Sequence, residues 1–368
     1  MDPNAAIARW EAYCDGLKQS GTRILETAVG LDDIEIAEGL RYLTRLMRSG
    51  IERHIEYADP LDPCMVETYN ERLKWGMDNP DSIYAMSAVD GRCEYELQGS
   101  VGDVPYFNFT SFTLSTQARH VQDGFLNGRE VDTDAQGRFV VHVGGAERAR
   151  NWLRLAPQSN SIMLRETFGN RAAERPMTCR IRYLGGAGPA RPLGLADMLG
   201  RVELAERFLG KTGQTFLQLA GLMSASVNEL GAVDDTLMRA MGADPNYFYH
   251  WGAFRLQPDE ALLLQLPEVP QCENWGLCLY NHWLESLDYA RSTINLNMFT
   301  SRANADGSVT LVVCARQPEA GNWLDTQGHA GGHMMLRWTH AVRNVAPLAR
   351  VVRLDGIDWQ QALRRWPA

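Results

Sequence analysis

The sequence lacks the features that mark several large classes of protein. Its 368 residues contain no Lys/Arg-rich run and carry a formal net charge of −9. A nucleic-acid partner is not expected, because a phosphate backbone requires a basic surface. The N-terminus has no basic segment followed by an apolar one, so no secretory signal is expected. The longest apolar runs, such as residues 309–315, are far shorter than the ~20 residues of a membrane-spanning helix. We therefore expect neither a nucleic-acid nor a membrane partner.

Cysteine patterns that bind metals are also missing. The seven cysteines are scattered along the chain and form no CxxC pair. Cys272 and Cys278 lie six residues apart, which is not a zinc spacing. Free and mostly buried thiols are typical of a cytoplasmic protein, and we expect that location.

Motifs for nucleotide cofactors and for serine nucleophiles are absent as well. The glycine-rich residues 185–188 precede a proline and open no phosphate-binding helix. Ser286 lacks the context of a nucleophile elbow. No flavin, nicotinamide or pyridoxal pattern is visible, so no organic cofactor is expected.

Helical and strand patterns alternate along the chain. Residues 32–57 predict an amphipathic helix in which Ile36, Leu40 and Leu43 begin an apolar stripe that packs, with Arg45 on the opposite face. Residues 82–101, with a turn at Asp90-Gly91, predict a β-hairpin. Two further helices are expected, at residues 195–209 and 212–223, between two series of short strands.

These patterns predict an α+β, mainly β fold. We expect two β-sandwich, jelly-roll-like domains, joined by a helical bridge and preceded by a helical segment. The predicted boundaries are 1–78 for the helical segment, 79–188 for the first sandwich, 189–243 for the bridge and 244–368 for the second sandwich.

The two β regions contain an internal repeat. Each has a glycine, a strand, the tripeptide Asn-Trp-Leu and the tripeptide Met-Leu-Arg in that order, and glycine to asparagine spans 14 residues in one copy and 15 in the other. The first copy carries these tripeptides at residues 151–153 and 163–165, and the second at 322–324 and 335–337. Shared residues are expected to be structural, and residues of one copy alone are candidates for function.

The second copy has reactive residues where the first has none. The first copy reads Arg-Leu-Ala-Pro at residues 154–157, whereas the second offers Asp325, Thr326, His329 and His333 among glycines. Asp325 and His329 are four residues apart, so a folded loop would let the carboxylate orient the imidazole for acid/base catalysis. Alternatively, His329 is a turn residue that bonds the backbone.

The spacing of His329 and His333 resembles HxxxH, which binds metal on a helix face. Glycines interrupt any helix here, and no glutamate follows the first histidine, so we expect no metal.

Residues 281–289 form a second polar cluster. Glu285 and Tyr289 are candidates for acid/base or substrate-orienting groups, and Asn281 and His282 for substrate binding. The alternative is a loop network that satisfies its own backbone. In residues 247–251 the alternate aromatics, including Tyr249 and Trp251, share one strand face and could line an apolar pocket.

The second half resembles the family called domain of unknown function 1214, and the first sandwich resembles the region that usually precedes it. The resemblance is carried by residues 258–262, 275–289 and 295–297, by Asp306-Gly307, by Asn-Trp-Leu-Asp-Thr at 322–326, by Gly328-His329 and by Arg337-Trp338. It covers residues 247–338 well and residues 80–184 more loosely. The resemblance implies a β-sandwich or jelly-roll-like domain and implies no agreed activity.

Two functions follow as hypotheses. The first is a cofactor-independent lyase, isomerase or hydrolase acting on a small apolar or aromatic substrate. In it His329 is the acid/base, Asp325 orients it, and Glu285 and Tyr289 assist. The substrate would contact Asn281, His282, Tyr249, Trp251, Thr326 and His333. The second is a non-catalytic module for small-molecule binding or assembly, with a possible homo-oligomer.

Overall fold

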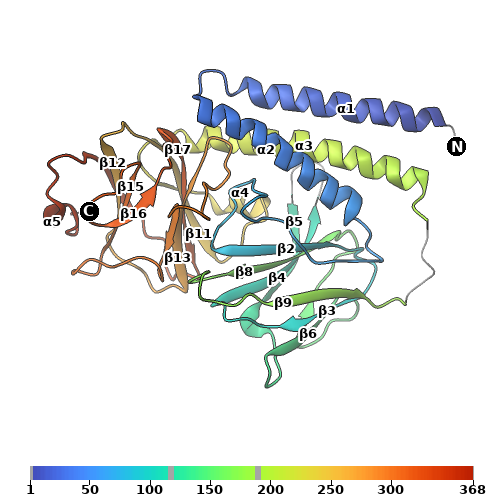
Figure 1. Ribbon diagram of the computed structural model, residues 1–368. Coiled ribbons are helices and arrows are strands. Elements are labelled where there is room, and N and C mark those ends of the chain that lie inside the picture. The colour runs from blue at the N-terminus through green and yellow to red at the C-terminus, as the bar shows by residue number, and fades with distance from the viewer. Residues whose placement is uncertain (1–2, 115–119, 187–191, 368) are drawn as a thin grey trace. The chain divides into compact units, whose positions relative to one another are not determined.

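A computed structural model describes residues 3–114, 120–186 and 192–367. Its contacts divide the chain into two compact units (Figure 1). Unit 1 comprises residues 1–31, 36–73 and 82–215, and unit 2 comprises residues 32–35, 74–81 and 216–368. Two short upstream segments therefore belong to the unit formed by the second half of the chain. Residues 187–191, which include most of the predicted boundary at residues 189–192 and part of the glycine-rich residues 185–188, lie outside the described residues.

Long helices lie at the N-terminal end of the chain and between the two β regions, and shorter helical segments lie within the β regions and near the C-terminus. They are α1 (Pro3–Glu26), α2 (Asp33–Ile51), a π-helical turn η1 (Glu52–Glu56), a 3-10 turn η2 (Gly128–Glu130), α3 (Leu195–Met223), α4 (Asp235–Ala240) and α5 (Trp359–Ala362). No described helix is long and apolar enough to span a bilayer.

Unit 1 contains a β-sandwich. One sheet has the order β1-β2-β8-β4-β5 and the other β7-β6-β3-β9. The strands are β1 (Val66–Glu67), β2 (Ser82–Ala88), β3 (Tyr95–Ser100), β4 (Tyr106–Leu114), β5 (His120–Asn127), β6 (Arg138–Val143), β7 (Trp152–Leu153), β8 (Ser161–Thr167) and β9 (Thr178–Tyr183). Side chains from both sheets, such as Phe109, Leu164, Leu97 and Val141, form one buried core.

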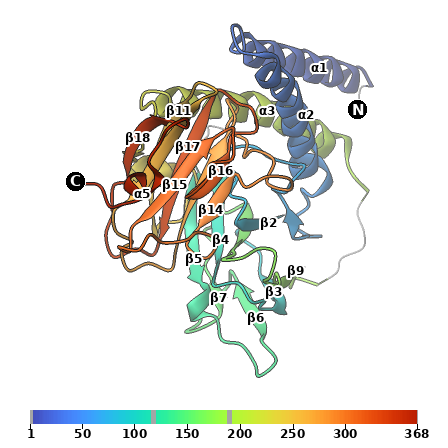
Figure 2. The same cartoon turned by 60° about the vertical axis from the view of Figure 1, so that its left-hand side comes forward.

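Unit 2 repeats this design. Its sheets have the orders β10-β11-β17-β13-β14 and β16-β15-β12-β18, so adding nine to each strand number of unit 1 gives the order in unit 2. Figure 2 labels β11, β14 and β17 of the first of these sheets and β15, β16 and β18 of the second. The strands are β10 (Gly231–Ala232), β11 (Tyr247–Arg255), β12 (Glu260–Leu266), β13 (Asn274–Tyr280), β14 (Asn295–Asn297), β15 (Val309–Cys314), β16 (Asn322–Asp325), β17 (Gly331–Thr339) and β18 (Leu348–Arg353). The prediction of a mainly β fold with two sandwiches is confirmed.

Residues shared by the two copies have the same structural roles. Asn151 and Asn322 each donate to two backbone carbonyls and accept one backbone N–H. The indole N–H of Trp152 donates to a carbonyl at 2.9 Å, and that of Trp323 donates to the Cys314 carbonyl at 3.0 Å. Buried indoles need such a partner.

The predicted hairpin at residues 82–101 is wrong, because β2 and β3 belong to different sheets. The link between them passes from one sheet to the other. Gly91 N donates to the Ser159 carbonyl at 2.8 Å, and Asp90 N donates to the Tyr95 hydroxyl at 2.7 Å. A Cβ at Gly91 would lie 1.8 Å from the Ala156 carbonyl oxygen, so this glycine permits a close backbone approach rather than a tight turn.

The two helices predicted between the sandwiches are one helix, α3. Gly210 and Gly213 lie at the predicted break, inside this helix, and face α1. A Cβ at Gly213 would meet Ile24 at 2.4 Å, and one at Gly210 would meet Ser20 at 2.9 Å. These positions allow the two helices to pack closely.

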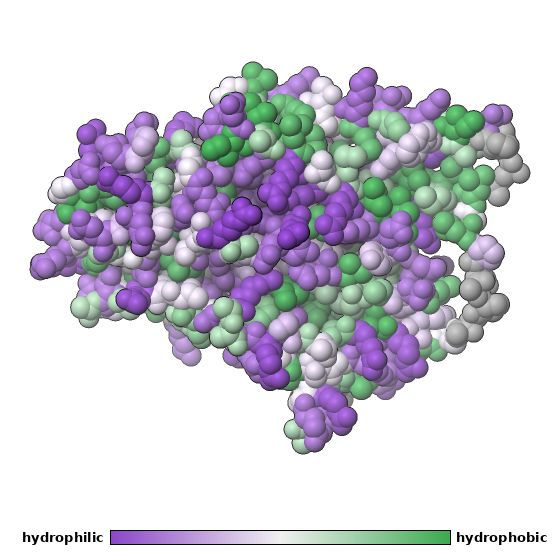
Figure 3. Space-filling view, in the orientation of Figure 1, coloured by the Kyte–Doolittle hydropathy of each residue, from purple (hydrophilic) through white to green (hydrophobic). Residues whose placement is uncertain are grey.

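The face of α2 that is buried differs from the predicted one. Ile36 and Leu40 are 38% and 54% exposed, whereas Arg45 is 7% exposed. The buried face instead begins at Glu35 and continues through Tyr42. Exposed apolar residues of α2 and of the turn before it contribute to the green areas at the top of Figure 3.

Candidate functional site

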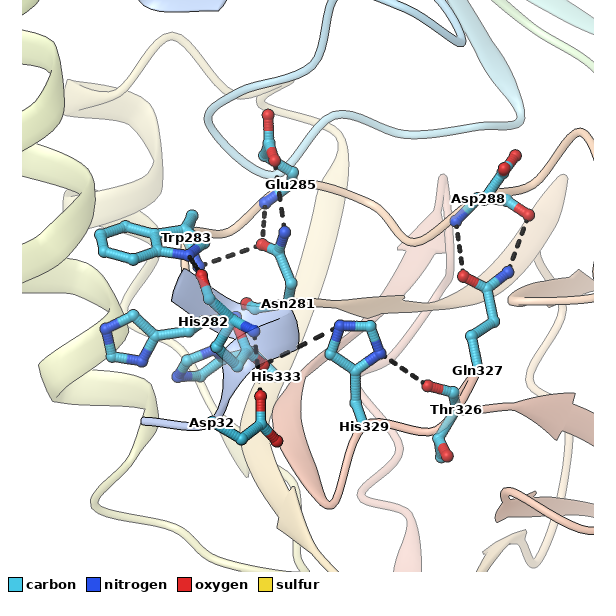
Figure 4. Close-up of polar contacts among 11 residues, drawn as sticks. Asp32, Asn281, His282, Trp283, Glu285, Asp288, Thr326, Gln327, His329 and His333 are labelled. Carbon is cyan, nitrogen blue, oxygen red and sulfur yellow. Dashed lines mark hydrogen bonds and ion pairs between the residues drawn. The ribbon is translucent and has the colours of Figure 1, made fainter. Parts of the chain in front are cut away.

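The loop between β16 and β17 has a fixed shape. The Asp325 carboxylate accepts the Gln327 backbone N–H at 2.8 Å, and Gln327 and Gly328 have positive φ angles of 53° and 87°. The Gln327 side chain accepts the backbone N–H of Asp288 at 3.0 Å and donates to its carbonyl at 2.9 Å. The loop is therefore anchored to the segment that follows β13 (Figure 4).

His329 is held in one orientation by the backbone. Its Nδ1 lies 2.8 Å from the Thr326 carbonyl oxygen, and its own N–H donates to the same oxygen at 3.0 Å. A carbonyl only accepts, so Nδ1 carries a hydrogen and Nε2 is the ring nitrogen that faces the site. Nε2 lies 4.0 Å from Oε1 of Glu35, and both side chains are buried. The carboxylate that faces His329 is thus that of Glu35, and Asp325 makes no hydrogen bond to this ring.

Glu35 comes from the first turn of α2 and was not predicted. Its backbone N–H donates to the Asp32 carboxylate at 3.0 Å, which caps the helix. Its Oε2 accepts the His282 backbone N–H at 3.1 Å, and its carbonyl accepts the Trp283 indole N–H at 2.8 Å. The sequence contains one signal that Glu35 is on a buried face of this helix. Glu35, Gly39, Tyr42 and Leu46 recur at helical spacing, and the glycine would allow another segment to pack closely.

The segment after β13 forms a compact loop around Asn281. The Asn281 side-chain oxygen accepts the backbone N–H groups of Trp283 and Glu285, each at 3.0 Å. Its amide nitrogen donates to the Glu285 carboxylate at 3.2 Å. Glu285 is 1% exposed. These contacts support a network that satisfies its own backbone, with Asn281 at its centre.

The end of that loop is bound by residues 74–81. The Lys74 ammonium donates to the carbonyls of Ser286 and Leu287 at 3.0 and 2.7 Å, and it lies 4.4 Å from the centre of the Tyr289 ring. The Asp78 carboxylate accepts the backbone N–H and the hydroxyl of Ser286. Tyr289 is thus a neighbour of the buried lysine.

His333 lies in β17, and its two ring nitrogens contact backbone and hydroxyl oxygens. Nδ1 is 3.1 Å from the Asn281 carbonyl, and Nε2 is 3.1 Å from the Ser224 hydroxyl and 3.2 Å from the Ala220 carbonyl. Burial lowers the pKa of His333, and burial lowers that of His282 to about 4, with the nearby His333 adding to it. Ring nitrogens used in this way do not form the HxxxH metal pair with His329.

Two predicted residues lie on β11. Tyr249 pairs in register with Arg337, and Trp251 pairs with Met335. They share the sheet face that carries His333, as the alternation predicts. The structure brings Asn281, His282, Thr326, His329 and His333 into one cluster, and it adds Glu35.

The described residues of unit 2 that could contribute metal ligands include Glu35 and His329.

Comparison with known proteins identifies the family. Residues 254–341 match the model of a protein of unknown function, DUF1214. The structure is similar to the crystal structure of an uncharacterized protein from Burkholderia cenocepacia, with 37% identity, a TM-score of 0.92, and coverage of 95% of this chain and 98% of that one. The VPA0106 protein from Vibrio parahaemolyticus is also similar, with 13% identity, a TM-score of 0.48, and coverage of 85% and 97%.

No curated protein matches the chain significantly. The match to the DUF1214 model lies in the half where the resemblance was expected, and the Burkholderia relative extends the likeness over nearly the whole chain. The chain belongs to one family with the uncharacterized Burkholderia cenocepacia protein, and its residues 254–341 match the DUF1214 model.

Proposed function

We propose that the protein is an enzyme in which His329 transfers a proton and Glu35 is its carboxylate partner. The observation that carries this proposal is the buried pair itself, with His329 Nε2 4.0 Å from Glu35 Oε1. The substrate would be a small apolar or aromatic molecule, and the reaction a lyase, isomerase or hydrolase step without an organic cofactor.

The geometry of the pair suits proton transfer. The Thr326 carbonyl fixes the hydrogen on Nδ1, so Nε2 is the atom that would take a proton from a substrate and return it. The imidazolium formed in this step would be stabilised by the Glu35 carboxylate, and more strongly in a buried site than in water. The loop that carries His329 is also the part of the second repeat that the first repeat lacks.

The test begins with a screen for small molecules that raise the melting temperature, followed by assays for their turnover. The variants His329→Gln and Glu35→Gln remove the proton-transfer group and its partner. We expect turnover to fall about 100-fold or more in His329→Gln. His340→Gln is the matched control, because His340 Nδ1 lies 3.8 Å from Glu273 Oε1 in the same unit, outside the proposed site.

Two results would contradict the proposal. One is turnover in His329→Gln equal to that of the wild type. The other is a ligand that binds the wild type and both variants equally and is never converted, which would favour the alternative of a binding or assembly module.

We also propose a cytoplasmic location and a homo-oligomer. The seven cysteines are free, which is typical of a reducing compartment. The apolar side chains of Ile36 and Leu40 on α2 are exposed, and contact with a second copy of the chain would bury them. Cell fractionation tests the first proposal, and light scattering over a range of concentrations tests the second.

A further inference from the structure

Glu35 reaches His329 through contacts with residues 282 and 283. The His282 backbone N–H donates to Oε2 of Glu35 at 3.1 Å, which leaves Oε1 directed at the imidazole. The Trp283 indole donates to the Glu35 carbonyl at 2.8 Å and fixes the backbone of the same residue. The position of the carboxylate therefore depends on the shape of the chain at residues 282 and 283.

That shape is imposed by Asn281. Its side-chain oxygen accepts two backbone N–H groups, those of Trp283 and Glu285, and its own N–H donates to the Glu285 carbonyl at 3.0 Å. Between them Leu284 has a φ of 58°, which is rare for a leucine and persists only where the surroundings enforce it. Asn281 closes the loop in the form that presents the His282 N–H to Glu35.

Asn281 is itself fixed to rigid elements. Its carbonyl oxygen lies 3.1 Å from Nδ1 of His333 on the central strand β17, and the other ring nitrogen of His333 contacts Ala220 and Ser224 at the C-terminal end of α3. Asn281 is 2% exposed and His333 is 3% exposed. Figure 4 shows Asn281 with its contacts to Trp283 and Glu285, and His333 and His329 nearby.

We propose that Asn281 is a positioning residue for the proposed reaction, which holds the Glu35 carboxylate against His329 by shaping the backbone at His282. This inference rests on the proposed function. It does not require Asn281 to touch a substrate, and it assigns His333 to the support of Asn281.

The experiment measures the ionisation of His329 directly, so no substrate is needed. Histidine rings are labelled with carbon-13, and the His329 resonance is assigned as the one missing in His329→Gln. Its titration midpoint is then compared in the wild type, Glu35→Gln, Asn281→Ala and the double variant. An opposite charge at this separation changes a midpoint by about one pH unit or more, so Glu35→Gln should lower it by that amount.

Asn281→Ala should lower the midpoint in the same direction, because the carboxylate is no longer held. In the Glu35→Gln background, Asn281→Ala should produce no further change, since the two residues act through one charge. Asn297→Ala is the matched control. The Asn297 side chain also accepts two backbone N–H groups, those of Phe299 and Thr300, and is 1% exposed. It should lower the melting temperature as Asn281→Ala does and leave the midpoint unchanged.

The outcomes separate the two proposals. If Glu35→Gln leaves the midpoint unchanged, the pair is not coupled and the proposed function fails. If Glu35→Gln lowers the midpoint and Asn281→Ala does not, only the role of Asn281 is overturned. Should Asn281→Ala not fold, Asn281→Ser keeps an oxygen acceptor with a shorter reach, and the same comparison applies to it.

Discussion

We predict that ionisation of Glu166 makes the stability of unit 1 depend on pH. This residue lies in β8, is 2% exposed, and its carboxylate accepts the Met177 backbone N–H at 2.7 Å. Burial raises the pKa of Glu166 from 4.5 to about 7, which outweighs the lowering by the Met177 N–H and by Arg171. In the second repeat the corresponding residue is Trp338, which has no charge to bury.

The sign of the effect follows from the two pKa values. The folded state holds the Glu166 proton more tightly than the unfolded state, so stability is full below pH 4.5 and is lost as the pH rises through about 7. The difference of about 2.5 pH units corresponds to a loss of about 3 kcal/mol, at about 1.4 kcal/mol per unit. Most of this loss falls between pH 5 and 8.

Glu166→Gln removes the ionisation and keeps an oxygen that can accept the Met177 N–H. We expect the variant and the wild type to have similar free energies of unfolding at pH 5. At pH 8 we expect the variant to be more stable by about 2–3 kcal/mol. Urea denaturation at several pH values measures this difference, and Glu147→Gln, at an exposed position of the same unit, should show none. A constant difference between Glu166→Gln and the wild type across this range would refute the reasoning.

Two further predictions concern the shared framework and the site loop. Trp152→Phe removes the indole donor to the Gly144 carbonyl, and Trp323→Phe removes the donor to the Cys314 carbonyl, so each should lower the free energy of unfolding by about 1 kcal/mol. Equal losses in chemical denaturation would support the shared role, and a loss in one copy alone would contradict it. Gly332→Ala places a Cβ 2.4 Å from the Tyr280 carbonyl oxygen, so the steric overlap should lower the free energy of unfolding by about 1–3 kcal/mol. A melting temperature equal to that of the wild type would contradict this close approach of the two backbones.

The strands of unit 2 could be predicted well because their patterns are strong. The largely apolar residues 260–266 form β12, in which all but Glu260 are buried. One face of its sheet lies in the sandwich, and the other is covered by the C-terminal segment, where Ala261 and Leu263 pack with Trp359 and Trp366. The repeat was predictable because both copies keep the residues that satisfy the same backbone groups.

The predictions of the hairpin at residues 82–101 and of the buried face of α2 were wrong because tertiary contacts decide the structure at both places. Asp90-Gly91 has the composition of a hairpin turn, yet Gly91 is needed because the backbone at Ala156 passes too close to it for a Cβ. The apolar spacing of α2 pointed to Ile36 and Leu40, whereas the folded chain buries Glu35, because that carboxylate finds an N–H donor at residue 282. No local pattern reports a partner that lies 247 positions further along the chain.

The segments that join unit 2 from upstream have a consequence for how this family can evolve. Because the two β-sandwiches have the same topology, recombination between their coding sequences could exchange or duplicate a single sandwich. A second sandwich moved alone would lose residues 32–35 and 74–81, and with them Glu35 and the Lys74 and Asp78 contacts to its loop. Inheritance of both repeats as one block is therefore expected wherever the Glu35–His329 pair is retained, and genomes that carry the second sandwich alone should have replaced one or both of these residues.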